Sequence, residues 1–210
     1  MNELKDEIAY FMRRLYTQNL TTTSGGNISV RDGDQILITP SGLDKGRLTG
    51  EQIGVMDLNG NMLGDPFKPS IENQMHLAIY KTRPDITAIV HAHPVGASSF
   101  AASSKVLNTK LLAESYLILG NIAVAEYHCI GSRELADAVA AGVADGTNCL
   151  LMRNHGALAL GNSLLEAFDR LEVMEACAKI NLNLFGVLAE TELELEPQKL
   201  QELDQLIGRK

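Results

Sequence analysis

The segment at residues 86–93, ITAIVHAH, is an apolar and β-branched run that ends with two histidines. Such a run predicts a buried strand, and side chains two positions apart on a strand point to the same face of its sheet. His91 and His93 should therefore lie side by side. A fold built around this strand places two imidazoles where both can reach one divalent metal ion.

A third histidine, His155, lies far along the chain in LLMRNHGALALG. The apolar residues on either side of it also predict strands, and its imidazole would complete a three-histidine site with an open fourth position. Catalytic zinc sites are built in that way, whereas structural sites are usually closed by four protein ligands. The alternative is a hydrogen-bonded pair of core histidines without a metal, because spacing alone does not fix the third ligand.

The composition predicts a globular protein and argues against two classes of partner. Of the 210 residues, 45% are apolar and 21% are charged, and no change in composition marks a linker. We therefore expect one domain over residues 1–210. The net charge is −8 and the lysines and arginines form no cluster, which argues against nucleic acid and anionic membranes as partners.

The cysteines and the N-terminal segment indicate the compartment. Cys129, Cys149 and Cys177 are odd in number and widely spaced, as expected for a reducing environment without a disulfide framework. The N-terminal segment is charged throughout and does not resemble a signal peptide, and no apolar run has the length of a membrane span. These features predict a cytoplasmic protein.

Short strands alternate with helices along the chain. Strands are expected within residues 21–31, 32–42, 86–93, 123–131 and 150–161, with a hairpin at 51–64 that turns at Asn59-Gly60. Helices are expected at residues 3–19, 68–84, 95–104, 132–146, 163–188 and 197–210. Because short strands are interleaved with hairpins and helices and do not form strict strand–helix–strand repeats, this order predicts an α/β fold with a largely antiparallel sheet and helices on its faces.

Two residues at the start of the helix at 68–84 are candidates for the site. Ser70 is expected to cap the helix, and Glu72 falls in its first turn. A carboxylate there complements the helix dipole, but it can also serve as a general acid/base beside a metal ion. The two roles are compatible, so the sequence leaves both open. His76, one turn later, is expected to be partly exposed, and His128 has no assigned role.

Three turns have the composition of an anion-binding site. Ser24-Gly25-Gly26-Asn27 and Thr39-Pro40-Ser41-Gly42 offer free backbone N–H groups, and the helix that begins near Ser70 offers more. Each of them alone is most simply an ordinary turn or cap. Together they favour a phosphate pocket, although the sequence does not show that they converge.

The runs SGGNISVR, ILITPSG, KPSIENQMHLAIYKTRPDITAIVHAHP and RNHGALALG resemble, in this order, the class II aldolase/adducin family. The resemblance covers about residues 5–190, and its pattern is most similar to the family members that cleave L-fuculose 1-phosphate. It implies a three-layer α/β/α sandwich around a mostly antiparallel sheet. It also implies a homotetramer with sites at the subunit interfaces.

The resemblance assigns roles to individual residues. His91, His93 and His155 match the ligands of one Zn²⁺ per subunit, and Glu72 matches a catalytic acid/base that can also touch the metal. Tyr116 matches a catalytic tyrosine presented to a neighbouring subunit. The matched phosphate-binding positions are Ser24, Gly26, Asn27, Ser41, Gly42, Ser70 and Ile71.

The implied reaction is cleavage of a ketose 1-phosphate to dihydroxyacetone phosphate and an aldehyde such as L-lactaldehyde, as part of fucose metabolism. An L-ribulose-5-phosphate 4-epimerase is the second possibility, although similar epimerases carry Asp at the position of Glu72. A methylthioribulose-1-phosphate dehydratase and a non-catalytic, adducin-like assembly module are the others.

Two departures from the aldolase pattern concern substrate preference. Ile71 stands where the aldolase usually has a second serine, so one hydroxyl contact is absent. The last tyrosine of this chain is Tyr127, so nothing replaces a second functional tyrosine in the C-terminal tail. Both departures bear on the aldehyde more than on the chemistry.

Overall fold

A computed structural model describes residues 1–188 and 194–209. Its centre is a seven-stranded sheet in the order β3-β2-β1-β4-β7-β6-β5. Adjacent strands are antiparallel except for the parallel pair β5 and β6. The strands are β1 (Asn27–Asp32), β2 (Gln35–Ile38), β3 (Gly54–Asp57), β4 (Ala88–Ala92), β5 (Ile122–Ala125), β6 (Cys149–Met152) and β7 (Gly156–Gly161).

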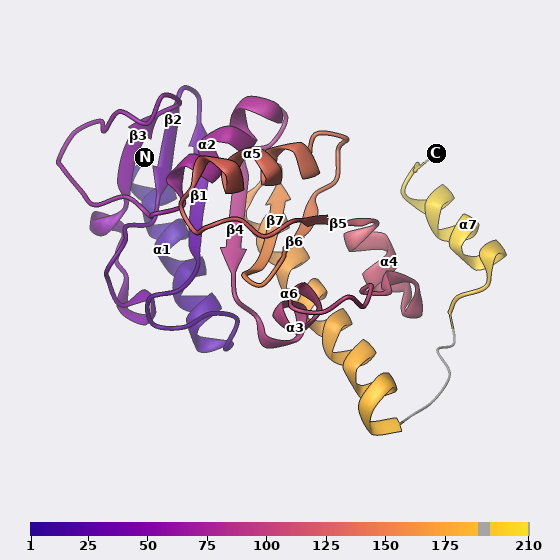
Figure 1. Cartoon of the computed structure of the whole chain (residues 1–210). Helices are drawn as coiled ribbons and strands as arrows, with labels where there is room; N and C mark the ends of the chain where they lie inside the picture. Colours follow the sequence, from indigo (N-terminus) through magenta and orange to yellow (C-terminus); the bar gives the residue numbers. More distant parts are fainter. Residues whose placement is uncertain (189–193, 210) are drawn as a thin grey trace.

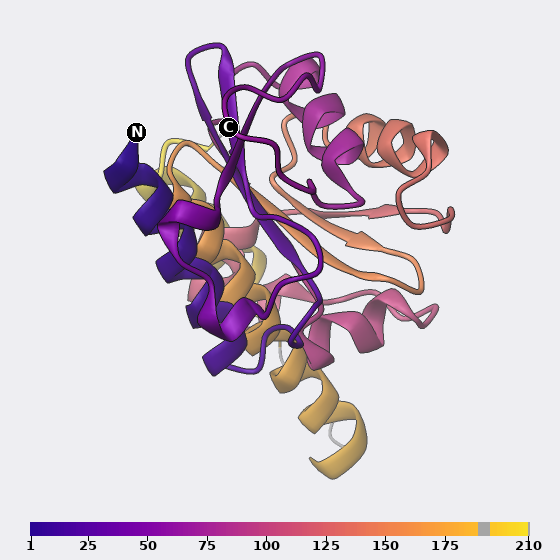
Figure 2. The ribbon, with the colours of Figure 1, turned by 90° about the vertical axis from the view of Figure 1, so that its left-hand side faces the viewer.

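Helices cover both faces of the sheet (Figures 1 and 2). In Figure 2, α2 and α5 lie on one side of the strands, and α1 and α6 lie on the other. This arrangement confirms the predicted three-layer α/β/α sandwich. The helices are α1 (Asn2–Thr17), α2 (Asn73–Thr82), α3 (Val95–Ala101), α4 (Ala113–Leu119), α5 (Arg133–Gly142), α6 (Leu164–Leu182) and α7 (Pro197–Leu206).

The middle strand, β4, explains the apolar run that precedes the histidines. It pairs with β1 on one side and β7 on the other, and all five of its residues are buried. Its side chains contribute to two separate cores, one under α1, α3 and α6 and the other under α2 and α5. A strand covered on both faces needs apolar residues at nearly every position, not an alternating pattern.

The sequence placed most elements correctly but missed some details. The helix at 132–146 begins as predicted, because Ser132 Oγ accepts a hydrogen bond from Leu135 N at 3.1 Å. The helix predicted at 68–84 begins later, with Glu72 at its N-cap, so the capping role predicted for Ser70 is wrong. The return strand of the predicted hairpin is reduced to one bridge between Met56 and Met62.

Two further differences concern the right-hand side of the molecule in Figure 1. Helix α4, which carries Tyr116, was not predicted, and β5 ends at Ala125, so His128 lies beyond the strand.

Among the described residues, no helix is both long enough and apolar enough to span a membrane.

Candidate metal centre and catalytic site

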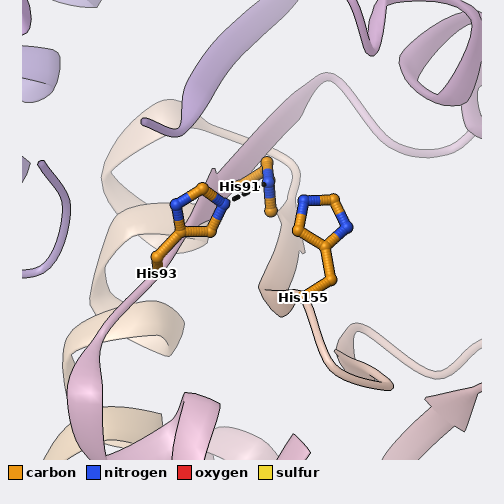
Figure 3. A group of neighbouring side chains, drawn as sticks. All are labelled: His91, His93 and His155. Atoms are coloured by element: carbon orange, nitrogen blue, oxygen red, sulfur yellow. Dashed lines mark hydrogen bonds between the residues drawn. The ribbon is translucent and has the colours of Figure 1, made fainter. Parts of the chain in front are cut away.

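The three histidines that the sequence singled out lie together (Figure 3). His91 is on β4, His93 follows the strand directly, and His155 lies in the turn between β6 and β7. One ring nitrogen from each lies within 4.8 Å of the other two, a group that could hold a metal ion. The sheet produces this arrangement because β4 and β7 are adjacent, with Ala92 opposite Ala157.

A backbone hydrogen bond orients the imidazole of His91 toward the shared site. His91 Nδ1 lies 2.9 Å from the carbonyl oxygen of Ala157, so this nitrogen carries the proton and Nε2 faces the site. His91 Nε2 and His93 Nε2 are 3.1 Å apart. Metal–nitrogen bonds of about 2.1 Å in a tetrahedron require nitrogens roughly 3.4 Å apart, so this spacing is close to that of a shared ion. The carbonyl partner is the usual way to fix a ligating tautomer.

The pKa values of the imidazoles also fit a metal site. Burial and the neighbouring His91 lower the pKa of His93 to about 3 and that of His155 to about 4, so both are neutral at pH 7. Burial alone would lower the pKa of His91, but the Glu72 carboxylate outweighs it and raises that pKa. The carboxylate therefore favours positive charge at the place where the three imidazoles meet, as a cation site requires.

Glu72 places its carboxylate between two of these rings. Its Oε2 lies 3.2 Å from His91 Nε2, and its Oε1 lies 3.1 Å from His155 Nε2. The second contact lacks hydrogen-bond geometry, so Oε1 is a buried acceptor without a hydrogen-bond partner in the described part of the chain. Burial would raise the pKa of Glu72, but His91, His155 and Asn27 together hold it well below its usual value.

A series of buried hydrogen bonds leads from Glu72 into the protein interior. Asn27 Nδ2 donates to Glu72 Oε2 at 2.9 Å, and Asn27 Oδ1 lies 2.5 Å from His76 Nε2. His76 Nδ1 lies 2.6 Å from Ser29 Oγ, which lies 2.9 Å from the Tyr80 hydroxyl. His76 is completely buried, so the prediction that it is partly exposed is wrong.

The charge on Glu72 fixes the direction of these hydrogen bonds. An ionised carboxylate only accepts, so Asn27 must present its NH₂ group to Glu72 and its oxygen to His76. Burial lowers the pKa of His76 to about 3, so the ring is neutral, donates from Nε2 and accepts at Nδ1. Ser29 then donates to His76, and Tyr80 donates to Ser29. The protons of Asn27, His76 and Ser29 therefore all point toward Glu72, which stabilises the carboxylate and its orientation, while the Tyr80 hydroxyl also lies 3.4 Å from the carbonyl oxygen of Thr87.

Glycines allow the backbone to pack closely around His93. A Cβ atom at Gly25 would lie 2.8 Å from His93 Nδ1, and one at Gly156 would lie 2.6 Å from His93 Cδ2. The backbone N–H of His93 also donates to the Leu20 carbonyl at 3.1 Å. The glycine-rich run near residue 25 therefore holds a histidine in place, a role that its composition did not reveal.

A cavity of about 160 Å³ lies against this group. Most of the residues expected to bind phosphate line it, whereas Gly42 does not. Ser70 Oγ accepts hydrogen bonds from Asn27 Nδ2 at 3.0 Å and from Glu72 N at 3.3 Å, and its own proton has no acceptor among the described residues. The lining consists of Ser24, Gly25, Gly26, Asn27, Ser41, Lys45, Ser70, Ile71, Glu72, His93, Ile130 and His155.

Tyr116 is not part of this cavity. It lies on α4, and its hydroxyl donates to Asp204 Oδ2 of α7 at 2.8 Å. That hydrogen bond, together with partial burial and the charge of Asp204, raises the pKa of Tyr116. A single chain thus brings together the histidines, Glu72 and the phosphate turns, but leaves the expected catalytic tyrosine outside.

Two residues of the site were missed from the sequence. His76 follows Glu72 by four positions on α2, and this helical spacing is a signal that could have placed both on one face. Lys45 follows the turn at residues 39–42 and is buried against the cavity. Nothing in the local sequence distinguishes Lys45 from a surface lysine.

The comparison with known families agrees with this geometry. The family model described as the class II aldolase and adducin N-terminal domain matches residues 6–182. This chain belongs to that family. The part of the chain that carries β1 to β7 and the three histidines lies within the matched range.

Two of the similar proteins carry the names of aldolases. The L-fuculose phosphate aldolase of Methanococcus maripaludis is 39% identical over 175 residues, which cover 83% of this chain and 94% of that protein. The 5-deoxy-D-ribulose 1-phosphate aldolase of Bacillus thuringiensis is 36% identical over 181 residues, which cover 84% of this chain and 83% of that protein.

A solved structure of an L-fuculose 1-phosphate aldolase superposes with a TM-score of 0.83 at 35% identity. It covers 98% of this chain and 96% of its own. Together these relatives support an enzyme of the aldolase type, a lyase.

Proposed function

We propose that this protein is a zinc-dependent aldolase that cleaves a ketose 1-phosphate to dihydroxyacetone phosphate and an aldehyde. L-fuculose 1-phosphate, which would yield L-lactaldehyde, and a 5-deoxyribulose 1-phosphate are the leading substrates, because similar proteins carry those names. The observation that carries the proposal is the Glu72 carboxylate, held between two imidazoles of a three-histidine group beside a cavity lined by the phosphate turns.

His91, His93 and His155 would hold the ion, one per subunit. Three imidazole nitrogens and an open position suit zinc and match catalytic sites of this metal. A bound ion acts as a Lewis acid that stabilises negative charge on the substrate's carbonyl and hydroxyl oxygens. Glu72 would contact the ion before substrate enters, because its oxygens lie beside the nitrogens of His91 and His155.

Glu72 would move the proton at the carbon next to the carbonyl. Its lowered pKa keeps it ionised at neutral pH, so in the direction of condensation it accepts a proton from C3 of dihydroxyacetone phosphate. In cleavage the C4 hydroxyl loses one proton and C3 gains one, so the reaction needs no net proton; Glu72 would take up the released proton and deliver it to C3 after the C3–C4 bond has broken. The amide of Asn27 and the buried network behind it keep the carboxylate pointed at the reacting carbon.

The phosphate group would lie against the turns around the cavity. Backbone N–H groups near Gly26 and Gly42, the hydroxyls of Ser24, Ser41 and Ser70, and the Asn27 amide are its proposed contacts. Ile71 can contribute only its backbone, since its side chain is apolar and 61% exposed.

Tyr116 would complete the site of a neighbouring subunit. There its hydroxyl would hold the proton of the C4 oxygen, which becomes the aldehyde oxygen. This role requires a homo-oligomer, because within one chain the Tyr116 hydroxyl is hydrogen-bonded to Asp204 and does not line the cavity. We propose that the oligomer is a tetramer.

A substrate panel tests the proposal. The purified, metal-loaded protein would be assayed with L-fuculose 1-phosphate, 5-deoxyribulose 1-phosphate, methylthioribulose 1-phosphate and L-ribulose 5-phosphate. We expect dihydroxyacetone phosphate from one or both of the first two substrates. Epimerisation of L-ribulose 5-phosphate or dehydration of methylthioribulose 1-phosphate, without that product, would contradict it. A protein that binds no metal and acts on none of the four would indicate an assembly module.

A further inference from the structure

Lys45 is a buried cation that the metal centre does not use. It lies in a short 3₁₀ turn at residues 45–47, and only 2% of its surface is exposed. Lysines are almost never buried to this extent unless they are paired, because an ammonium loses its hydration. The position of Lys45 therefore calls for an explanation in terms of a partner.

The protein supplies Lys45 with one weak partner. Its Nζ donates to the carbonyl oxygen of Pro40 at 2.6 Å, and no carboxylate in the described part of the chain forms an ion pair with it. An ammonium has three N–H donors, so two of them have no acceptor among the described residues. Burial, with no compensating charge, lowers the pKa of Lys45 to about 8.

The same lysine joins two of the turns expected to bind phosphate. Its backbone N–H donates to the Thr23 carbonyl at 2.9 Å, while its side chain reaches the carbonyl of Pro40. It also lines the 160 Å³ cavity beside Ser41, Ser70 and Asn27. A buried lysine without an ion-pair partner among the described residues thus lines a small cavity together with serine hydroxyls, the Asn27 amide, the Glu72 carboxylate and two imidazoles.

We propose that Lys45 binds the phosphate group of the substrate and supplies the positive charge that the turns lack. A phosphate monoester carries close to two negative charges at neutral pH, and lysine binds it as a point charge. The phosphate oxygens accept hydrogen bonds from the two unused N–H groups of Nζ, while the third N–H group keeps its hydrogen bond to the Pro40 carbonyl. This inference rests on the proposed function for the identity of the substrate, but the anion site itself can be tested without catalysis.

Two variants separate the charge from the structural role of the side chain. Lys45→Met keeps most of the length and removes every donor, whereas Lys45→Gln keeps a donor that can reach the carbonyl of Pro40 but removes the charge. Lys68→Met is the matched control. Lys68 is exposed and its carbonyl accepts from Ser41 N, so it lies on the neighbouring loop without facing the cavity.

Binding of inorganic phosphate to the full-length protein would be measured by calorimetry and by thermal unfolding. We expect phosphate to stabilise the wild type and Lys68→Met equally. Both Lys45 variants should bind it roughly 10- to 100-fold more weakly, the usual range for a lost hydrogen bond to a charged group. If both variants bind phosphate as tightly as the wild type, or if the wild type binds none, the inference is wrong.

Kinetics give the second readout. With a ketose 1-phosphate, Lys45→Gln should raise KM by about 10- to 100-fold and change kcat much less, because the phosphate contact is the same in ground and transition states. A fall in kcat alone would assign Lys45 to the reacting end and overturn the proposal. The wild type could also bind phosphate, lose that binding in the Lys45 variants, and yet cleave no sugar phosphate. That result would support this inference and contradict the proposed function.

Discussion

Glu72 and Tyr116, the two groups expected to move protons, lie in contrasting surroundings. Glu72 is 6% exposed and contacts His91, His155 and Asn27. Tyr116 lies on α4, which is at the edge of the molecule beside α7 (Figure 1), and its hydroxyl donates to Asp204. One group is fixed by the central strands, whereas the other is presented by a surface helix.

The contrast shows how the work of one site can be divided. A carboxylate that must keep its position beside a cation needs rigid neighbours, and β1, β4 and the start of α2 supply them. A group that serves a different subunit must instead reach the surface. The contrast therefore leads us to expect metal binding to be a property of each chain and complete catalysis to be a property of the oligomer.

The largest effect is expected at the metal ligands. His93→Ala removes one of three imidazoles, and we expect kcat for ketose 1-phosphate cleavage to fall by at least about 10,000-fold. His128→Ala is the matched control, because it removes a histidine beyond the end of β5 and should leave kcat unchanged. Steady-state assays of both variants decide the point. Full activity in His93→Ala would contradict a catalytic metal site held by the central strands.

Glu72→Gln should separate catalysis from metal binding. The amide has the same shape but cannot accept the C3 proton, so kcat should fall by about 100- to 10,000-fold. The three histidines are untouched, and the bound metal should remain near the wild-type level. Rates and metal content would be measured on the same preparation. Loss of the metal in Glu72→Gln would make the carboxylate an essential ligand and not only a base.

Tyr116→Phe tests the other half of the comparison. If the hydroxyl serves a neighbouring site, kcat should fall by about 100-fold. Co-expression of Tyr116→Phe chains with Glu72→Gln chains should then restore activity, because some mixed sites combine an intact Glu72 with an intact Tyr116. Random mixing predicts about a quarter of the wild-type rate. If the mixed oligomers are as inactive as the two parent variants, either Glu72 and Tyr116 of the same chain act together or Tyr116 has no part in the reaction.

The smallest of these effects is expected at His76, which acts through Asn27. His76→Phe fills the same space but leaves Asn27 Oδ1 without a donor, and we expect kcat to fall by about 10- to 100-fold. His76→Gln keeps a donor near the position of Nε2 and should recover most of that loss. If His76→Phe and His76→Gln have equal kcat values but different unfolding temperatures, His76 has only a packing role.

The sequence predicted the parts of the site that local patterns determine. The strand with His91 and His93 was recognised because spacing along a strand fixes which side chains share a face. His155 could not be linked to them by spacing, since its place depends on the pairing of β4 with β7. The residues offered His155 only as a candidate, the resemblance to a family assigned it, and the structure places it within reach of the other two histidines.

Burial was the property that local patterns missed. His76 was expected to be partly exposed and Lys45 was not singled out, yet both are buried where α2 and the turn at residues 45–47 pack against the site. Their burial depends on contacts between distant segments, such as Asn27 with His76 and Lys45 with Thr23. The prediction of one domain over residues 1–210 and the assigned roles of the site residues stay predictions.

Metal analysis of the purified protein tests the central claim most directly. Elemental analysis after removal of free metal should find one divalent ion, expected to be zinc, per chain in the wild type and in His128→Ala. His93→Ala should hold little or none at the same free-metal concentration. A wild type that binds no ion, or a His93→Ala variant that binds as much as the wild type, would contradict a metal centre built from His91, His93 and His155.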